Sequence, residues 1–361
     1  MKGTDVVVVG ASVCGAVCSR ELASKGVRTL LLEEHSKAGK FGKCTGIVSK
    51  HGLGLTGVDY RRTVVNEVSG ADFHSGKACL TVCSPRVQAL VIDRQAFDEQ
   101  AVAQAVDAGA ELLLGARVDG LYGTQVNAGN KRFKARFAVG ADGAASAVAR
   151  LAGFPAIPAG KFVLGYEAEY SRASVADSSK VDVFFEPEFR GFFGWKVPCS
   201  PDSARIGFCT SDFASLELGK RKLMELPRVR ETIAGKARRV REFAAVIPLA
   251  LRRQTQRRNV LLVGDAAGQV KATTGGGIVF GSVCARTVAE CIASQLRDGT
   301  ALNYEWSWRA KFGKALALHS ALRSAANALP SGVWPACVSA ASALGVDTLL
   351  EKFGDMDFVV R

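Results

Sequence analysis

The chain has 361 residues, of which 48% are hydrophobic, and it carries a formal net charge of +13. A chain of this length can bury a full core and predicts two domains or one large intertwined domain. Its ten cysteines are scattered singly, with no Cys-x-x-Cys pair, no histidine at ligand spacing and no visible secretory signal. These features argue against a zinc-finger or disulfide-scaffold class, and they predict reduced thiols, no bound metal and a cytoplasmic protein.

The first elements form a β-turn-α-β unit. Residues 5–9 (DVVVV) predict a strand buried on both faces, residues 16–26 a helix, and residues 27–34 (VRTLLLEE) a second strand. In such a unit a dinucleotide pyrophosphate lies on the helix N-terminus, here against the turn residues Gly10, Ser12, Cys14 and Gly15. Ser12 stands where a second glycine is usual, and Glu33 is placed for the ribose hydroxyls. A purely structural βαβ unit is the alternative.

The pattern changes twice along the rest of the chain. Residues 96–110 predict a helix, 111–121 a strand, turn and strand, and 132–146 a strand that ends in a glycine turn. From about 160 to 250, alternating segments such as FVLGYEAEY and SARIGFCTS predict antiparallel strands, before NVLLVGDAAG at 259–268 returns to the buried parallel style. We therefore predict an α/β fold with three parts: a discontinuous nucleotide-binding domain (1–158 and 255–300), an antiparallel substrate domain (159–254) and a helical C-terminal region (301–361).

Two surface features leave alternatives open. Eight arginines and lysines between 236 and 258 surround an apolar centre, which indicates either an anion-binding patch or a solvated basic face. Few aromatics are interleaved with them, so nucleic acid is disfavoured as a partner. Residues 324–346 carry no charge, but Pro330 and Pro335 argue against a spanning helix. A hairpin that touches a bilayer or lines an apolar tunnel, and an ordinary packed helix pair, both fit.

A second glycine-rich turn occurs at 264–278, GDAAGQVKATTGGGI. The preceding strand places Asp265 at its carboxyl end, where an acid can accept hydrogen bonds from the ribityl chain of a flavin. The Thr-Thr-Gly-Gly-Gly turn then begins a helix at Ile278, whose positive end would face the charge of a reduced flavin. A tight turn with a capping aspartate is the structural alternative.

Several motifs occur together in the order of one known family. They are GASVCG with LLLEE, KCTGIVS at 43–49, IDRQAFDE at 92–99, VGADGAASAVAR at 139–150, the 264–278 turn and GDMD at 354–357. On these motifs the chain resembles the geranylgeranyl reductase family, which includes digeranylgeranylglycerophospholipid reductases and has a glutathione-reductase-like FAD-binding Rossmann domain. GDAAG alone also occurs in aromatic hydroxylases and halogenases.

The resemblance implies FAD and assigns contacts to it. Gly10, Ser12, Cys14, Gly15 and Arg94 would meet the pyrophosphate, Glu33 the ribose, and Val118 the adenine. Asp265 would bind the ribityl chain, and the flavin ring would contact Cys44, Thr45, Ile47, Gly277 and Ile278. Phe193 and Trp195 would form the substrate wall, although Val197 departs from the family's aromatic-x-Trp-x-Phe-Pro pattern.

These residues predict an FAD-dependent reductase that saturates C=C bonds of a geranylgeranyl or other polyprenyl chain, on a lipid or a diphosphate. Cys44 or a water would donate the proton, and the basic patch would hold the phosphate end. The alternatives are an FAD-dependent monooxygenase of an apolar or aromatic substrate, and a non-catalytic flavin-bound lipid-binding or redox module. No second unit for NADPH is visible, so ferredoxin and NADPH stay open as electron donors. Peripheral contact with the inner face of the membrane is a further expectation.

Overall fold

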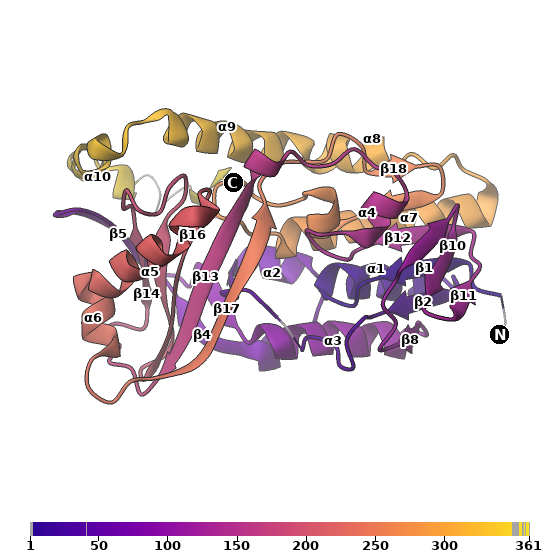
Figure 1. The fold of residues 1–361 in the computed structure, drawn as a ribbon, viewed down its shortest axis with the longest axis horizontal. Helices are drawn as coiled ribbons and strands as arrows, with labels where there is room; N and C mark the ends of the chain where they lie inside the picture. Colours follow the sequence, from indigo (N-terminus) through magenta and orange to yellow (C-terminus); the bar gives the residue numbers. More distant parts are fainter. Residues whose placement is uncertain (1–2, 41, 349–353, 356, 358, 361) are drawn as a thin grey trace.

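The structure is a computed structural model that describes residues 3–40, 42–348, 354–355, 357 and 359–360. A six-stranded, mainly parallel sheet forms one half of the molecule (Figure 1). Its order is β18 (Gln256–Arg257), β19 (Val260–Leu262), β12 (Phe137–Gly140), β1 (Val6–Val9), β2 (Thr29–Leu32) and β8 (Glu111–Leu113). The parallel sheet thus collects strands from distant parts of the chain.

The central strand β1 explains why this sheet is covered on both faces. All four valines of β1 are buried, and alternate side chains enter different cores. Val6 and Val8 pack against the helical side, formed by α1 (Val13–Ser24), α3 (Arg94–Asp107) and α7 (Ile278–Asp298). Val7 and Val9 pack against the opposite side, formed by α4 (Ala147–Leu151), β9 (Gly120–Tyr122), β10 (Gln125–Ala128) and β11 (Lys131–Phe133).

A seven-stranded, mainly antiparallel sheet forms the other half. Its order is β17 (Arg238–Pro248), β13 (Phe162–Ser171), β16 (Ser203–Thr210), β15 (Gly194–Ser200), β14 (Lys180–Phe184), β5 (Gly70–Ser75) and β6 (Ala78–Cys83). Helices α5 (Leu216–Glu225) and α6 (Pro227–Ile233) contribute apolar side chains to a core on this sheet. A third, smaller sheet has the order β3 (Ile47–Ser49), β7 (Ala89–Ile92) and β4 (Val64–Val68). Helix α2 (Lys50–Leu55) directly follows β3 in the chain.

The seven-stranded sheet includes two strands from outside the predicted substrate domain. We placed residues 70–83 in the nucleotide-binding domain, but β5 and β6 extend the substrate sheet because β14 pairs with β5 in parallel. This pairing joins segments that lie more than a hundred residues apart, and local periodicity carries no signal for it. The substrate sheet therefore includes an earlier hairpin in addition to strands from the predicted 159–254 segment.

The C-terminal region connects the two halves. Figure 1 shows α9 (Lys314–Ala328) along one edge of the molecule, between α8 (Tyr304–Trp308) and α10 (Trp334–Ala343). Helix α8 packs on α7, whereas α10 packs on β5 and β6. A short antiparallel pair, β20 (Gly354–Asp355) and β21 (Val359–Val360), follows these helices in a region that we predicted to be mostly helical. Within the described residues, no helix combines the length and the apolar character needed to cross a bilayer.

Candidate functional site

A cavity of about 1260 Å³ is lined by residues of both sheets. Every site residue predicted from the sequence lines it, with the exception of Gly15. The lining set is Gly10, Ser12, Cys14, Glu33, Cys44, Thr45, Ile47, Arg94, Val118, Phe193, Trp195, Asp265, Gly277 and Ile278. The fold thus brings together side chains from the whole length of the chain, and a cavity of this size suits a dinucleotide or a drug-sized ligand.

The turn after β1 has the geometry of a dinucleotide site. Gly10 has a φ of 99°, and Ser12 is the N-cap of α1 without a side-chain cap. Gly15 packs inside the turn, because a Cβ there would overlap the carbonyl oxygen of Gly10. Gly15 therefore shapes the turn and does not line the cavity. The amides at the start of α1 and the positive end of its dipole are suited to an anion.

Glu33 lies where β2 ends and contacts the same turn. Its Oε2 accepts a hydrogen bond from the amide of Ala11 at 2.9 Å, and its Oε1 lies 2.6 Å from His35 Nδ1. The carboxylate stays in the cavity wall, so it remains placed for ligand hydroxyls beside the turn.

Asp98 is a buried acid beside the first glycine-rich turn, and we did not predict its role from the sequence. Asp98 Oδ1 accepts a hydrogen bond from the amide of Val13 at 3.0 Å and lies 3.2 Å from Arg94 Nε. Arg94 also donates to Ser12 Oγ at 2.7 Å. Burial raises the pKa of Asp98, and the adjacent Arg94 opposes this rise. The Asp-Arg spacing in IDRQAFDE was visible, but only the packing of α3 against α1 shows that Asp98 reaches the turn.

The second glycine-rich turn places the acid Asp265 at the cavity wall. Asp265 follows β19, and its side chain makes no hydrogen bond to another described residue, although burial raises the pKa of its carboxyl. Gly277 is close by, and the helix α7 begins at the next residue. A half-buried carboxylate that faces the cavity and accepts no hydrogen bond from a described residue fits a ligand rich in hydroxyl groups. The residues of both turns therefore fit the sugar-alcohol chain and the phosphates of FAD.

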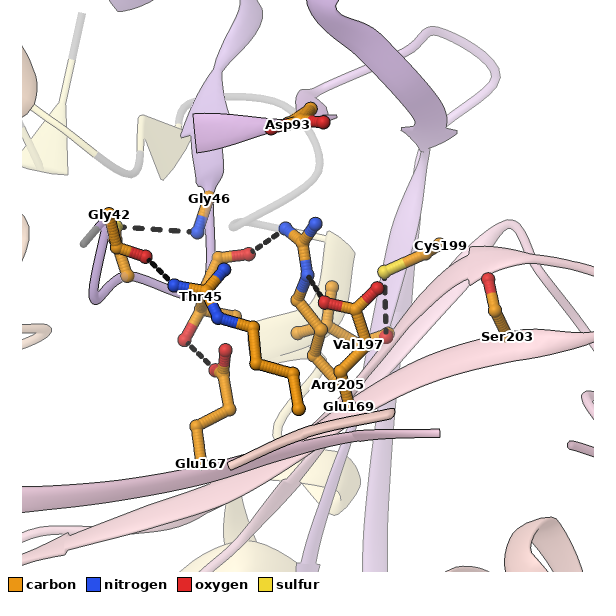
Figure 2. A network of polar contacts seen from close by, with 12 residues as sticks. Gly42, Thr45, Gly46, Asp93, Glu167, Glu169, Val197, Cys199, Ser203 and Arg205 are labelled. Atoms are coloured by element: carbon orange, nitrogen blue, oxygen red, sulfur yellow. Dashed lines mark hydrogen bonds and ion pairs between the residues drawn. The ribbon is translucent and has the colours of Figure 1, made fainter. Parts of the chain in front are cut away.

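The loop before β3 is held against the substrate sheet by a polar network (Figure 2). Arg205 Nη1 donates to the carbonyl of Thr45 at 2.6 Å and to the carbonyl of Ile92 at 2.9 Å. The Thr45 hydroxyl and Trp195 Nε1 both donate to Glu167 Oε2. The Cys44 thiol accepts from the amide of Gly46 at 3.3 Å. Glu167 and Arg205 were not predicted, because their partners are distant in sequence.

The part of the cavity beyond this loop is apolar and aromatic. Phe192 and Phe193 stack with ring centroids 4.5 Å apart, and Phe193 meets Trp195 edge to face at 6.2 Å. Phe193 also meets Phe185 edge to face at 6.2 Å, and Phe185 stacks on Trp334 of α10 at 4.8 Å. Trp334 belongs to the uncharged 324–346 stretch, so part of that stretch lines the cavity.

The C-terminal motif GDMD reaches the second turn through Asp357. Its carboxylate accepts hydrogen bonds from Lys271 and Ser49, and its carbonyl lies 2.8 Å from His319 Nε2. His319 Nδ1 is in turn 2.7 Å from Thr273 Oγ1. Met356 of the motif lies outside the described residues. These contacts tie α9 and the C-terminal segment to the turn that precedes α7.

One cluster outside the cavity brings potential metal ligands together. Ligand atoms of Asp72, His74 and Asp182 lie within 4.8 Å of one another. Lys196 pairs with Asp182 at 2.6 Å, and Lys180 lies 3.6 Å from Asp72. The two lysines balance the carboxylate charges, so the cluster is explained as an ion-pair network on the substrate sheet.

Comparison with known proteins places the chain in a family. The family model described as lycopene cyclase protein matches residues 5–325. A digeranylgeranylglycerophospholipid reductase of Methanopyrus kandleri is 30% identical over 336 residues, which cover 86% of this chain and 83% of the relative. The chain belongs to the family that this model describes and, by this relative, to the digeranylgeranylglycerophospholipid reductases. The family that we predicted from the sequence motifs is therefore confirmed.

Solved structures of other proteins confirm the predicted fold of this chain. A geranylgeranyl bacteriochlorophyll reductase-like protein from Thermoplasma acidophilum matches with a TM-score of 0.87 at 21% identity, over 95% of this chain and 92% of that protein. A flavin-dependent brominase matches with a TM-score of 0.78 at 16% identity, over 99% and 94% of the two chains. At these identities the likeness establishes the fold alone, and that fold is the predicted flavoprotein architecture.

Proposed function

We propose that this protein is an FAD-dependent reductase that saturates C=C bonds of a geranylgeranyl or related polyprenyl chain. The observation that carries the proposal is a single cavity with two different ends. One end combines the two glycine-rich turns with Glu33, Arg94 and Asp265, which suit FAD. The other end is walled by Phe192, Phe193, Trp195 and Trp334, which suit an apolar chain. The activity for which the related reductases are named agrees with this combination.

The cofactor would be held by residues already described. Gly10, Ser12 and Cys14 of the first turn would meet the pyrophosphate, with Arg94 beside them, and Val118 would lie against the adenine. Asp265 would accept hydrogen bonds from the ribityl hydroxyls, and the start of α7 at Gly277 and Ile278 would face the flavin ring. Cys44, Thr45 and Ile47 would line the reacting side. When bound and reduced, FAD supplies a hydride to one carbon of the double bond.

The anionic end of the substrate is assigned to Arg323. Of the three arginines that line the cavity, Arg94 lies 3.2 Å from a carboxylate of Asp98 and Arg117 lies 3.7 Å from one of Glu34. Arg323 has no carboxylate within ion-pair distance among the described residues, and it stacks over Phe192 with its guanidinium carbon 4.9 Å from the ring centroid. Burial lowers the pKa of Arg323 to about 10, against an opposing contribution from Cys209. A phosphate or diphosphate would supply the missing counter-charge.

This assignment replaces the basic patch of 236–258 as the headgroup site. The arginines and lysines of that patch do not line the cavity, whereas Phe243, Ala245, Val246 and Ile247 from its apolar centre do. Arg241 instead donates to the carbonyl of Gly42 and holds the loop before β3. We keep ferredoxin and NADPH as the candidate electron donors, and a peripheral position on the inner membrane face as part of the proposal.

The proposal is tested by the cofactor and by its reoxidation. The purified protein should release FAD and not FMN on denaturation. After anaerobic reduction, geranylgeranyl lipid or diphosphate should reoxidise the flavin, as followed by its visible absorbance. A protein that takes up no FAD would refute the cofactor assignment. Flavin that is reoxidised only by oxygen, with substrate-dependent oxygen consumption, would favour the monooxygenase.

A further inference from the structure

Glu167 is a buried acid placed between the predicted flavin side and the apolar part of the cavity. It lies on β13, its relative exposure is 2%, and it lines the cavity. Cys44 and Thr45 lie on the loop above it, as Figure 2 shows for Thr45. Aspartate and glutamate are almost never fully buried unless they are paired, and acids with strongly shifted pKa values cluster at functional sites.

The sheet register explains how Trp195 reaches this acid. Glu167 pairs with Gly207 of β16, and Gly207 pairs in turn with Trp195 of β15. A Cβ on Gly207 would lie 2.6 Å from Trp195 Cζ2. Because Gly207 has no side chain, the indole crosses β16 and donates from Nε1 to Glu167 Oε2 at 2.9 Å.

The hydrogen bonds on Glu167 distinguish its two oxygens. Thr45 Oγ1 and Trp195 Nε1 both donate to Oε2. Oε1 accepts from no described residue, so it is the oxygen that carries the proton when the acid is neutral. Burial raises the pKa of Glu167, while the Thr45 hydrogen bond and the charge of Arg205 oppose the rise. Burial therefore favours the protonated carboxyl, and the two hydrogen bonds to Oε2 stabilise the carboxylate left after its proton departs.

We propose that Glu167 is the catalytic proton donor of this site, an inference that rests on the proposed reductase function. In the reaction, one alkene carbon gains the hydride and its two electrons. The other carbon gains the proton of Glu167 Oε1, so two C–H bonds form while the C=C π bond, the O–H bond of Glu167 and the bond that held the hydride on reduced FAD break, and FAD would be left oxidised. The product is the saturated bond, and Glu167 is left as a carboxylate that takes its next proton from water.

Glu167 suits this step better than Cys44, which the sequence alone indicated. The Cys44 sulfur accepts a hydrogen bond from the amide of Gly46, whereas the Glu167 carboxyl receives two side-chain hydrogen bonds that stabilise the anion left after proton transfer. The Thr45 and Trp195 hydrogen bonds are in place before the charge develops, which is the arrangement that stabilises a transition state.

The test compares Glu167→Gln with Glu169→Gln, which lies two residues along β13 and does not line the cavity. In single turnovers of the prereduced, FAD-loaded protein, Glu167→Gln should reduce prenyl substrate at least ~100-fold more slowly, since general acid catalysis typically contributes this much or more. Glu169→Gln should keep most of the rate, and both variants should retain FAD. The wild-type rate should fall as pH rises through the pKa of Glu167, because only the neutral acid donates.

Two further measurements distinguish a proton-donor role of Glu167 from a general loss of activity or of folding. The emission of Trp195, taken as the difference between wild type and Trp195→Phe without FAD, should titrate with pH in the wild type and not in Glu167→Gln. Thr45→Val removes a hydrogen bond to the carboxylate, so the alkaline limb of the rate profile should move to higher pH at saturating FAD.

The outcomes are distinguishable. If wild type and Glu167→Gln reduce the substrate at equal rates, or if the limb does not move in Thr45→Val, Glu167 is not the donor while the reductase function stands. If a slow rate is found in Cys44→Ala together with a full rate in Glu167→Gln, the donor is Cys44. If the wild type reduces no prenyl substrate, the reductase function fails and the donor role of Glu167 fails with it.

Discussion

A Cβ on Gly277 would lie 2.8 Å from Asp265 Oδ1. Asp265, the acid of the second glycine-rich turn, and Gly277, which precedes α7, therefore lie close together across the turn. Since the φ of Gly277 is −112°, the requirement for glycine here is one of space and not of backbone conformation.

Gly277→Ala should weaken FAD binding, because the added methyl group must displace the Asp265 carboxylate from the cavity wall. Gly54→Ala is the matched control, since nothing lies within 4 Å of its added Cβ. FAD affinity is measured by quenching of flavin fluorescence. Equal affinities in the two variants would mean that Asp265 does not hold the cofactor.

Asp265→Asn should have opposite effects on binding and on stability. Loss of a charged acceptor should cost about 1.5–3 kcal/mol of FAD binding, roughly a tenfold to hundredfold rise in Kd. The raised pKa of Asp265 means that its ionisation disfavours the folded state without FAD, and this cost grows as pH rises above the ordinary value of 3.8. The variant without FAD should therefore unfold at a higher temperature than wild type at neutral pH. A lower melting temperature together with normal FAD affinity would assign Asp265 to the turn alone.

Arg323→Gln should separate charged from uncharged substrates. The KM for geranylgeranyl diphosphate should rise at least ~10-fold, because a charge-assisted hydrogen bond is worth about 1.5–3 kcal/mol. The KM for the uncharged geranylgeraniol should change little, and this alcohol is the internal control. An equal rise for both substrates would place Arg323 in the packing of the aromatic wall and not at the headgroup.

Asp182→Asn should change the acid stability of the substrate sheet. Burial alone would raise the pKa of Asp182, but hydrogen bonds from His74 and Lys196 outweigh it, and the pKa is lowered. A lowered carboxyl pKa stabilises the fold above the ordinary value of 3.8, and this stabilisation is lost as pH falls through the folded-state pKa. The variant should have a flatter acid limb of unfolding free energy, and at pH 7 it should lose about 3–5 kcal/mol, because Lys196 is left buried and unpaired. Asp59→Asn at an exposed pair should change little.

The sequence was sufficient for the parts of the site that depend on local order. The turns at Gly10 and Asp265 each follow a buried strand and precede a helix. Because strand, turn and helix are neighbours in the sequence, local patterns are enough to predict them. Because parallel strands deliver their carboxyl ends to one edge of a sheet, both turns could be predicted to face the same ligand.

The remaining parts of the site depend on pairings between distant segments. Glu167 is 122 residues from Thr45, and its contact with Trp195 depends on two strand registers and a glycine between them. Arg323 lies on a helix whose pattern reads as an ordinary amphipathic segment. Asp98 was part of a recognised motif, but its hydrogen bond to Val13 arises from packing of α3 on α1. No local periodicity carries these contacts.

The most direct test of the proposed reductase function is the mass of the product from a single anaerobic turnover. The FAD-loaded protein is reduced with dithionite, mixed with a geranylgeranyl lipid or diphosphate, and the extracted substrate is analysed by mass spectrometry. We predict a product heavier by two hydrogen atoms for each bond reduced, with both new hydrogens derived from solvent when the reaction is run in D₂O, because dithionite supplies only electrons. Recovery of unchanged substrate from the reduced protein, with an oxygenated product formed only in air, would contradict it.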